Sequence, residues 1–315
     1  MSTDTPTTPY DPDLLILDGG LATELEQRGH DLNHPLWSAR ILLSAPNAIR
    51  EVHEAYLDAG ADIITTATYQ ASFPGLQKEG LSTHDALDVF ELAVDLAVQA
   101  KNQFASPLRQ PLVAASIGPY GAYRADGSEY VGQYDRSEEQ LLDFHQDRFE
   151  ILADSRADLL ACETIPSLPE TRALATLIQD HPENLAWVSF TCRDGKHISD
   201  GTPITQCARL LNPIPNVIAL GVNCTPPHLV PNLINQLRPA TTKPLIIYPN
   251  SGEQYDPKSR SWHGDGSPEA YADNAEAWAQ AGATIIGGCC RTTPHHIKQL
   301  TKSLIHRTPT PIPNS

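Results

Sequence analysis

Three cysteines have the residue type and the placement to hold one metal ion. Cys289 and Cys290 follow the β-branched run Ala283–Ile286 and two glycines, and Cys224 ends a second apolar run that begins at Val217. Neighbouring side chains on a regular strand point to opposite faces, so the adjacent pair can share one ion only where the strand has ended. Three thiolates that leave one position open are the ligand set expected of a catalytic zinc ion.

The residues around the adjacent pair favour ionised thiols. Gly287 and Gly288 are predicted to end the strand by taking backbone angles that other residues adopt only at a cost. Pro294, which follows two threonines, is predicted to begin a helix whose N-terminus favours negative charge beside the thiols. That environment favours the thiolate, which is the form that binds metals and attacks electrophiles. An adjacent cysteine pair alone is more often structural, and it is Cys224 that favours a metal site.

The rest of the chain repeats one unit, an apolar run that ends in polar residues or glycine, followed by a loop and an amphipathic helical stretch. Eight such runs are expected to be strands, at residues 14–20, 63–70, 111–119, 158–166, 186–192, 217–224, 244–252 and 283–290. Helical patterns between them cover residues 47–59, 83–104, 138–154, 168–179, 225–237, 268–281 and 294–306. Apolar strands separated by helices predict a parallel sheet that is covered by helices.

Eight units predict an α/β fold of one domain, a closed (β/α)8 TIM barrel over residues 13–306. An open, doubly wound sheet is the alternative, because strands are easily miscounted from one sequence. The barrel is preferred because Asp18-Gly19-Gly20 runs into Leu-Ala-Thr-Glu, where a nucleotide-binding open sheet would carry Gly-x-Gly-x-x-Gly. Residues 1–12 and 307–315 are expected to be disordered tails.

The chemistry of a TIM barrel gathers at the carboxyl ends of its strands. Those ends are polar here, with Asp18 at the first strand, Glu163 at the fourth and Asn223-Cys224 at the sixth. Polar residues at the tips of apolar strands are costly unless they face a solvated site. Two loops, residues 120–134 and 253–266, are rich in glycine, aspartate and aromatic residues, and they are expected to cover the barrel mouth as lids.

Composition excludes several kinds of partner. A formal net charge of -16 over 315 residues opposes binding to phosphate backbones, so nucleic acid is not an expected partner. No apolar run is long enough to span a membrane and the first thirteen residues are polar and acidic, so a cytoplasmic protein without membrane contact is expected. In that reducing compartment the six cysteines are expected to be thiols or metal ligands, with Cys162, Cys192 and Cys207 filling the core.

Six motifs taken together resemble the homocysteine S-methyltransferases. They are Asp-Gly-Gly-Leu-Ala-Thr-Glu-Leu at 18–25, Pro-Leu-Trp-Ser-Ala at 35–39, Ser-Ile-Gly-Pro-Tyr-Gly-Ala-Tyr at 116–123, Gly-Val-Asn-Cys at 221–224, Tyr-Pro-Asn-Ser-Gly-Glu at 248–253 and Gly-Gly-Cys-Cys-Arg-Thr-Thr-Pro at 287–294. The resemblance covers about residues 12 to 305, which is nearly the whole chain.

The resemblance implies a barrel that holds zinc on Cys224, Cys289 and Cys290, with homocysteine bound through its sulfur at the open zinc position. It also implies that Asp18 and Glu163 help to hold the amino acid end of homocysteine. A small methyl donor then transfers its methyl group to that sulfur, and methionine is formed. The branch with the most similar motifs uses S-methylmethionine and often accepts S-adenosylmethionine as well.

Departures from other branches narrow the choice of donor. Betaine-using relatives carry a tyrosine directly after the strand-four glutamate and a long C-terminal oligomerisation arm, whereas this chain has Thr164 and ends at Ser315. Betaine is therefore not expected as a donor, and a monomer is expected. Cobalamin-dependent methionine synthases add folate and corrinoid domains for which no sequence is left, so the expected donor is a small soluble molecule.

Each candidate substrate-binding residue has a structural alternative. Asp18 could cap the turn into the following helix and Glu163 could form an internal ion pair, but buried carboxylates at strand tips suit a substrate ammonium. Trp37 and Tyr69 could form a cation–π wall for the sulfonium donor, or they could simply pack in the core. The resemblance implies that Asn250 can occupy the open metal position before homocysteine arrives, although asparagine before Ser-Gly is also ordinary in turns.

Histidine is the commonest zinc ligand, and twelve histidines are present. None follows a strand tip, so surface or capping positions are expected for His30, His34, His53, His295 and His296. Two other classes of function remain open. A zinc-dependent barrel hydrolase would need histidine or carboxylate ligands and a general base, and a thiol redox protein would use the adjacent pair, whose disulfide would close a strained eight-membered ring.

Overall fold

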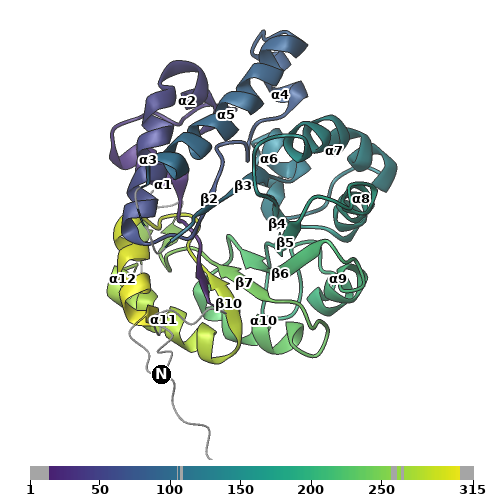
Figure 1. Cartoon of the computed structure of the whole chain (residues 1–315). Coiled ribbons are helices and arrows are strands. Elements are labelled where there is room, and N and C mark those ends of the chain that lie inside the picture. The colour runs from purple at the N-terminus through teal and green to yellow at the C-terminus, as the bar shows by residue number, and fades with distance from the viewer. Residues whose placement is uncertain (1–13, 105, 107–108, 257–260, 264–265, 306–315) are drawn as a thin grey trace, which may run out of the picture.

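The computed structural model describes residues 14–104, 106, 109–256, 261–263 and 266–305. Eight parallel strands form one sheet in the order β1-β10-β7-β6-β5-β4-β3-β2, and helices surround it (Figure 1). The strands are β1 (Leu15–Ile16), β2 (Ile63–Thr65), β3 (Leu112–Ile117), β4 (Leu159–Ile165), β5 (Ala186–Phe190), β6 (Val217–Asn223), β7 (Leu245–Tyr248) and β10 (Ala283–Ile286).

The sheet closes on itself where β1 meets β2. Leu17 and Ile63 form a parallel bridge, the backbone N–H of Asp62 donates to the carbonyl of Ile16 at 2.7 Å, and the N–H of Asp18 donates to the carbonyl of Ile63 at 3.0 Å. The predicted (β/α)8 barrel is therefore confirmed, and the open sheet is excluded. Each predicted strand is present but shorter than predicted, because the polar residues at its tip have left the regular ladder.

Helices surround the barrel, and most of the predicted helices begin and end within one residue of the predicted positions. They are α1 (Leu21–Gln27), α2 (Ala39–Ser44), α3 (Pro46–Ala59), α4 (Phe73–Lys78), α5 (Thr83–Gln103), α6 (Tyr120–Arg124), α7 (Glu138–Ala153), α8 (Leu168–Asp180), α9 (Ile204–Leu211), α10 (Val230–Leu237), α11 (Pro268–Gln280) and α12 (Pro294–Ile305). Serine side chains cap the first turns of α4, α5, α7, α8 and α11. These caps satisfy backbone N–H groups that would otherwise lack partners.

Several helical segments differ from the prediction. The predicted helix over residues 225–237 divides into a 3-10 turn, η2 (Pro227–Leu229), and α10. The prolines at its start cannot supply the N–H groups of a regular first turn. The short helices α2, α4, α6 and α9 were not predicted. In α9 the buried residues Ile204, Cys207, Ala208 and Leu211 nevertheless have the spacing of one helical face.

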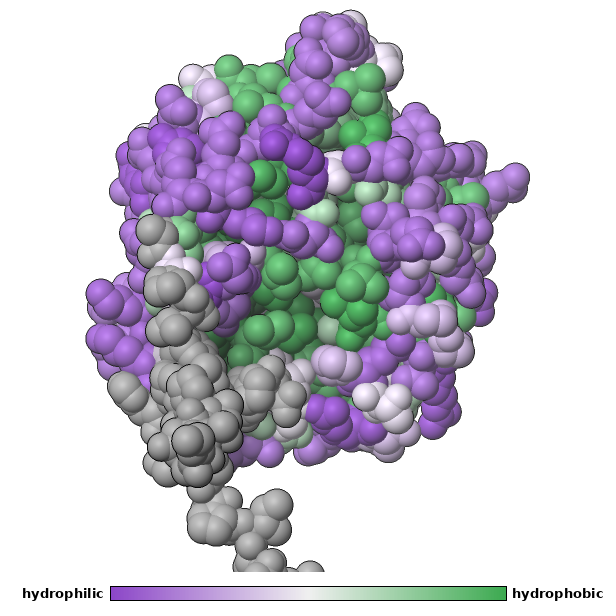
Figure 2. Space-filling model, in the orientation of Figure 1, coloured by the Kyte–Doolittle hydropathy of each residue, from purple (hydrophilic) through white to green (hydrophobic). Residues whose placement is uncertain are grey.

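Two hydrophobic layers hold the barrel together. One fills its interior with side chains that include Leu17, Ile63, Trp187 and Ile246, and the other lies between the strands and the surrounding helices. Figure 2 shows hydrophobic residues at the centre of the view, framed by hydrophilic residues over the helices. Cys162, Cys192 and Cys207 are buried in the outer layer, which confirms that they fill the core.

One histidine prediction is wrong. His53 is fully buried on α3, and neither ring nitrogen has a hydrogen-bond partner among the described residues. It lies four residues after Ile49 and therefore on the same buried face of the helix, where burial lowers its pKa to about 4. His296 does act as a cap, because its Nδ1 accepts from the backbone N–H of Thr293 at 3.2 Å, but its side chain is buried.

The chain ends and part of one expected lid lie outside the described residues. These are the predicted tails 1–12 and 307–315, and residues 257–260 and 264–265 of the loop after β7. Within that loop, β8 (Gln254–Asp256) and β9 (Ser261–His263) form an antiparallel pair. In the described part of the chain, we find no helix with the length and apolar character needed to cross a membrane.

Candidate active site

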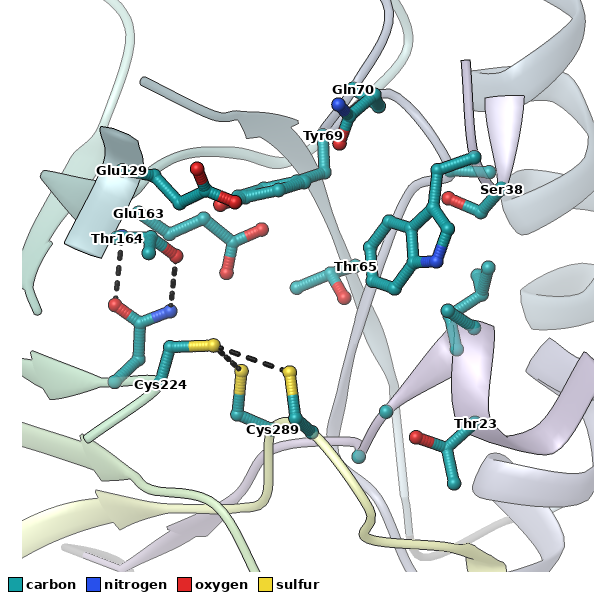
Figure 3. Close-up of a pocket in the computed structure, with 18 of the residues that line it drawn as sticks. Thr23, Ser38, Thr65, Tyr69, Gln70, Glu129, Glu163, Thr164, Cys224 and Cys289 are labelled. Atoms are coloured by element: carbon teal, nitrogen blue, oxygen red, sulfur yellow. Dashed lines mark hydrogen bonds between the residues drawn. The ribbon is translucent and has the colours of Figure 1, made fainter. Parts of the chain in front are cut away.

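A cavity of about 350 Å³ lies at the carboxyl ends of the barrel strands (Figure 3). Its wall includes Asp18 after β1, Thr65 at the end of β2, Glu163 in β4, Cys224 after β6 and Cys289 after β10. These residues are far apart in the sequence, and they meet because parallel strands of a barrel end on one face.

The three predicted cysteine ligands meet in this cavity. The Sγ of Cys224 lies 2.9 Å from that of Cys289 and 3.4 Å from that of Cys290, as the dashed lines in Figure 3 mark. All three sulfurs lie within 4.8 Å of one another, close enough to share one metal ion. Cys224 is buried, and the other two are half-buried at the cavity wall.

The adjacent pair reaches one point because β10 ends three residues earlier, at Ile286. The reason predicted for Gly287 and Gly288 is not observed, since neither has a φ in the left-handed region. Both glycines are instead needed for close packing, because a Cβ on Gly288 would lie 2.3 Å from Oγ1 of Thr292 and one on Gly287 would lie 2.6 Å from Cβ of Leu17. The helix predicted at Pro294 begins there, just after the pair.

A hydrogen-bonded link between β4 and β6 positions Cys224. The side-chain oxygen of Asn223 accepts from the backbone N–H of Thr164 at 2.8 Å, and its amide donates to Oγ1 of Thr164 at 2.7 Å. Thr164 has a φ of 62° and Cys224 a φ of 48°, values that non-glycine residues adopt rarely. The link therefore spans the tip of β5, which lies between β4 and β6, and joins two strand ends with strained backbone.

The thiols fit a thiolate-binding metal ion on electrostatic grounds. Hydrogen bonds from Cys224 and Cys289 hold the pKa of Cys290 well below its usual value, whereas hydrogen bonding with Cys224 raises the pKa of Cys289 well above it. Sulfur anions this close repel one another, so a bare cluster favours one thiolate among neutral thiols. A soft divalent cation would allow all three to ionise.

Asp18 does not cap the helix that follows it. Its Oδ2 accepts from the backbone N–H of Thr65 at 2.7 Å and from the Thr65 hydroxyl at 3.0 Å, while the N-cap residue of α1 is Gly20. The carboxyl group is 2% exposed, and burial raises its pKa well above the usual range. Asp18 thus joins β1 to β2 and still lines the cavity.

Glu163 lines the same cavity from β4. Its Oε1 accepts a hydrogen bond from the hydroxyl of Ser116, and burial raises its pKa to about 7. The proposed structural alternative was an internal ion pair, but Glu163 has no lysine or arginine partner among the described residues. A cationic group of a ligand would compensate its charge.

The predicted aromatic residues both lie at the cavity wall. Trp37 and Tyr69 have ring centroids 6.2 Å apart and an interplanar angle of 67°, an edge-on arrangement. Asn250 lies outside the set of lining residues. Its backbone N–H donates to the carbonyl of Thr225, and its buried Oδ1 has no hydrogen-bond partner among the described residues.

The lining also contains polar residues that were not predicted as site residues, among them His34, Glu129 and Tyr130. The last two belong to the loop after β3, which reaches the cavity as predicted, and the hydroxyl of Tyr130 lies 3.7 Å from Sγ of Cys224. The glycine and aspartate content of this loop marked it as a lid. It did not show which side chains turn inward.

The cavity therefore combines three carboxyl groups, three thiols and aromatic rings. Lysine and arginine are absent from its described lining, and His34 is the one basic side chain there. Such a site attracts cationic ligands and presents sulfur ligands to a metal ion. Histidine and carboxylate ligands, which a zinc hydrolase would use, do not form the metal-binding group found among the described residues.

Comparisons with known proteins agree with one family. The family model described as "Homocysteine S-methyltransferase" matches residues 15–304. The chain is 49% identical over 293 residues to "Homocysteine S-methyltransferase YbgG" from Bacillus subtilis, covering 91% of this chain and 93% of that protein. It is 47% identical over 292 residues to the Escherichia coli homocysteine S-methyltransferase, covering 91% and 94%. The crystal structure of the E. coli homocysteine methyltransferase MmuM, metallated form, superposes with a TM-score of 0.84 at 43% identity, covering 93% of this chain and 96% of that one.

Proposed function

This chain belongs to the homocysteine S-methyltransferase family and is an enzyme that methylates homocysteine, and we propose that it does so with zinc and a sulfonium donor. The proposed donor is S-methylmethionine, with S-adenosylmethionine as a second possibility, and the product is methionine. The observation that carries the proposal is the group of three sulfurs in an anionic, aromatic cavity. Family membership sets aside the hydrolase and thiol redox alternatives.

Cys224, Cys289 and Cys290 would hold the zinc ion. Their three sulfurs are close enough to share it and would leave a fourth position for the substrate. When bound, zinc would supply a lowered pKa for the substrate thiol, so that homocysteine reacts as the thiolate at neutral pH. A solved relative in a form described as metallated supports a metal at this site.

Asp18 and Glu163 are proposed to bind the ammonium group of homocysteine. Both carboxyl groups are buried, and burial raises the pKa of each. Ionised carboxylates this deep are costly without a cation, and an ammonium group would both neutralise them and fix the substrate with its sulfur toward the cysteines. The hydrogen bonds from Thr65 and Ser116 hold the two carboxylates in place while the substrate is bound.

The donor is proposed to lie against Trp37 and Tyr69. A sulfonium over an aromatic face gains about 0.5–2 kcal/mol, and the described lining has no lysine or arginine to repel it. The sulfonium becomes a neutral thioether as the methyl group leaves, so the reaction requires no general acid. In-line positioning of two bound reactants can contribute about 7–11 kcal/mol of barrier reduction.

Two finer predictions remain part of the proposal. Asn250 is proposed to occupy the open metal position before homocysteine binds, and its buried, unpartnered Oδ1 supports this role. The enzyme is also proposed to act as a cytoplasmic monomer. Six free cysteines suit a reducing compartment, and the large apolar side chains exposed among the described residues are few: Leu43, Tyr130, Val131 and Leu185.

A donor competition assay tests the proposed function. The zinc-loaded enzyme is incubated with homocysteine and S-methylmethionine, S-adenosylmethionine or betaine, and the methionine formed is measured. We expect the fastest turnover with S-methylmethionine, slower turnover with S-adenosylmethionine and none with betaine. Turnover with betaine alone would refute the sulfonium donor, whereas failure to methylate homocysteine with any of the three would refute the proposal as a whole.

Substitution of the cysteines tests the metal site. Cys224→Ala, Cys289→Ala and Cys290→Ala are each expected to lose tightly bound zinc, from about one ion per chain in the parent enzyme, and to lose methionine formation with it. Metal content by mass spectrometry and methionine yield are measured on the same samples. Cys207→Ala is the matched control, since Cys207 is buried in the core and should leave zinc and activity in place. Full turnover by a metal-free variant would contradict the mechanism.

A further inference from the structure

Glu129 has a carboxylate that the site described so far does not use. It lies in the 3-10 turn η1 (Ser128–Tyr130) of the loop after β3, and it lines the cavity. Its Oε2 is buried and has no hydrogen-bond partner among the described residues. A buried carboxylate oxygen without a donor is costly, so this atom is suited to a donor that a ligand brings.

The position of Glu129 separates it from the residues proposed for homocysteine. In Figure 3, Glu129, Glu163 and Tyr69 point into the same part of the cavity, and the cysteine sulfurs lie below them. Asp18 and Glu163 belong to the barrel strands and their ends, whereas Glu129 enters from a loop that covers the mouth. It can therefore contact a ligand that lies above the first substrate.

The carboxyl groups of the cavity favour cationic groups on its ligands. Its described lining has three carboxyl groups, from Asp18, Glu163 and Glu129, and no lysine or arginine. Homocysteine brings one ammonium group, which the proposed function assigns to Asp18 and Glu163. A sulfonium amino acid brings a second ammonium group together with its sulfonium. The third carboxylate matches that second ammonium group.

We propose that Glu129 determines donor specificity by pairing with the α-ammonium group of the sulfonium donor. This inference rests on the proposed function, because it takes the donor to be an amino acid such as S-methylmethionine. The aromatic rings of Trp37 and Tyr69 are left for the sulfonium itself. Glu129 thus binds the part of the donor that does not react.

The chemistry of the donor explains why the ammonium group, and not the sulfonium, is the partner. The sulfonium loses its charge as the methyl group leaves, so a carboxylate beside it would stabilise the bound donor more than the transition state and would slow the reaction. The ammonium group keeps its charge throughout. A carboxylate paired with it stabilises both states equally, and it changes KM without changing kcat.

The loop is built to hold Glu129 in this place. A Cβ on Gly121 would lie 2.3 Å from the backbone nitrogen of Glu129, so only glycine allows the two segments to pack this closely. The hydroxyl of Tyr134 accepts from the N–H of Gly121 at 3.0 Å, and Asp126 Oδ1 accepts from the N–H of Ser128 at 3.0 Å. These contacts fix the backbone at Glu129 before the donor binds, which lowers the entropy lost on binding.

Glu129→Gln tests the inference in the zinc-loaded enzyme, because it removes the charge and keeps the shape. We expect KM for S-methylmethionine to rise by about 10- to 100-fold, the effect of losing a hydrogen bond to a charged group, with kcat and KM for homocysteine within about threefold of the parent values. The dissociation constant of S-methylmethionine, measured by calorimetry, should rise by the same factor. Glu183→Gln is the charge-matched control, since Glu183 is exposed before β5 at the opposite end of the barrel.

A second donor distinguishes pairing with the ammonium group from a general effect. Dimethylsulfoniopropionate keeps a sulfonium and a carboxylate but lacks the amino group, so Glu129→Gln should change its kcat/KM by less than about threefold. An equal loss on both donors, a loss in kcat alone, or a raised KM for homocysteine would each overturn the inference. The proposed function is judged separately by the parent enzyme: if it uses S-methylmethionine while Glu129→Gln has the parent KM, only this inference fails.

Discussion

Glu163 is expected to reduce the stability of the metal-free enzyme at neutral and higher pH, and Glu163→Gln should reveal this cost. Burial raises the pKa of Glu163 from 4.5 to about 7, although hydrogen bonds from Ser116 and Tyr248 oppose the rise. One pKa unit corresponds to about 1.36 kcal/mol, so ionising this group in the folded chain costs about 3 kcal/mol more than in the unfolded chain.

The sign of the pH dependence follows from where the proton is bound. Between about pH 4.5 and 7 the folded chain keeps a proton on Glu163 that the unfolded chain has lost, so the free energy of unfolding falls as the pH rises. Below this window both states are protonated and the cost is absent, and above it the cost is present in full. Glutamine cannot ionise, so the free energy of unfolding of Glu163→Gln minus that of the parent should increase by about 3 kcal/mol from pH 4 to pH 8.

Urea unfolding of the reduced, chelator-treated proteins measures this difference. Parent and variant are compared at each pH from 4 to 8 by tryptophan fluorescence, and the other titrating groups cancel in the difference. Glu183→Gln, which removes an exposed carboxylate, should show no such trend. A difference that stays constant within about 0.5 kcal/mol, or that falls with pH, would refute the assignment of a raised pKa to this carboxyl group. The variant should bind homocysteine less tightly, because the costly charge is the one proposed to bind its ammonium group.

Two substitutions outside the cavity lining test how the barrel supports the site. The buried guanidinium of Arg148 donates to the carbonyls of Ala71 at 3.0 Å and Gly118 at 2.6 Å. Arg148→Met would leave both carbonyls without this donor, at about 1–3 kcal/mol each, so it should lower the free energy of unfolding by about 2–5 kcal/mol in urea unfolding. An unchanged value would contradict the role of this residue. A Cβ on Gly221 would lie 1.6 Å from the carbonyl oxygen of Ile246, so Gly221→Ala should force β6 and β7 apart and cost about 3 kcal/mol or more. Retention of the parent melting temperature would count against that reading.

The barrel could be predicted because its strands are buried on both faces. All seven residues of β4 are buried, and such strands read as continuous apolar runs that helices separate. Strand lengths were less predictable, because the tips depart from the ladder where they meet the cavity. The helix α9 was not predicted, although its apolar spacing is present in the sequence. It has only eight residues and lies within a long connection between two strands.

In the candidate site, the residues at strand ends could be predicted and those on the loop after β3 could not. Cys224, Asp18 and Glu163 could be identified because the carboxyl ends of parallel strands meet on one face of a barrel, whatever their separation in the sequence. Glu129 and Tyr130 could not, because the direction of a loop side chain depends on local contacts such as the packing of Gly121 against the loop. The resemblance of the motifs identified a family, and it did not identify these contacts.

Backbone strain explains why strand alternation alone does not predict where the side chains of the candidate site point. Trp37, Thr164, Cys224 and Arg291 all have a φ between 46° and 68°, and each lines the cavity or follows a residue that does. Such conformations cost about 1–3 kcal/mol each, and they persist only where surrounding contacts fix them. For Thr164 the side chain of Asn223 provides those contacts. The site needs side chains from separate strands to face one point, and the left-handed backbone at these positions helps to turn them there. None of these residues is a glycine, so the sequence does not indicate the left-handed conformation.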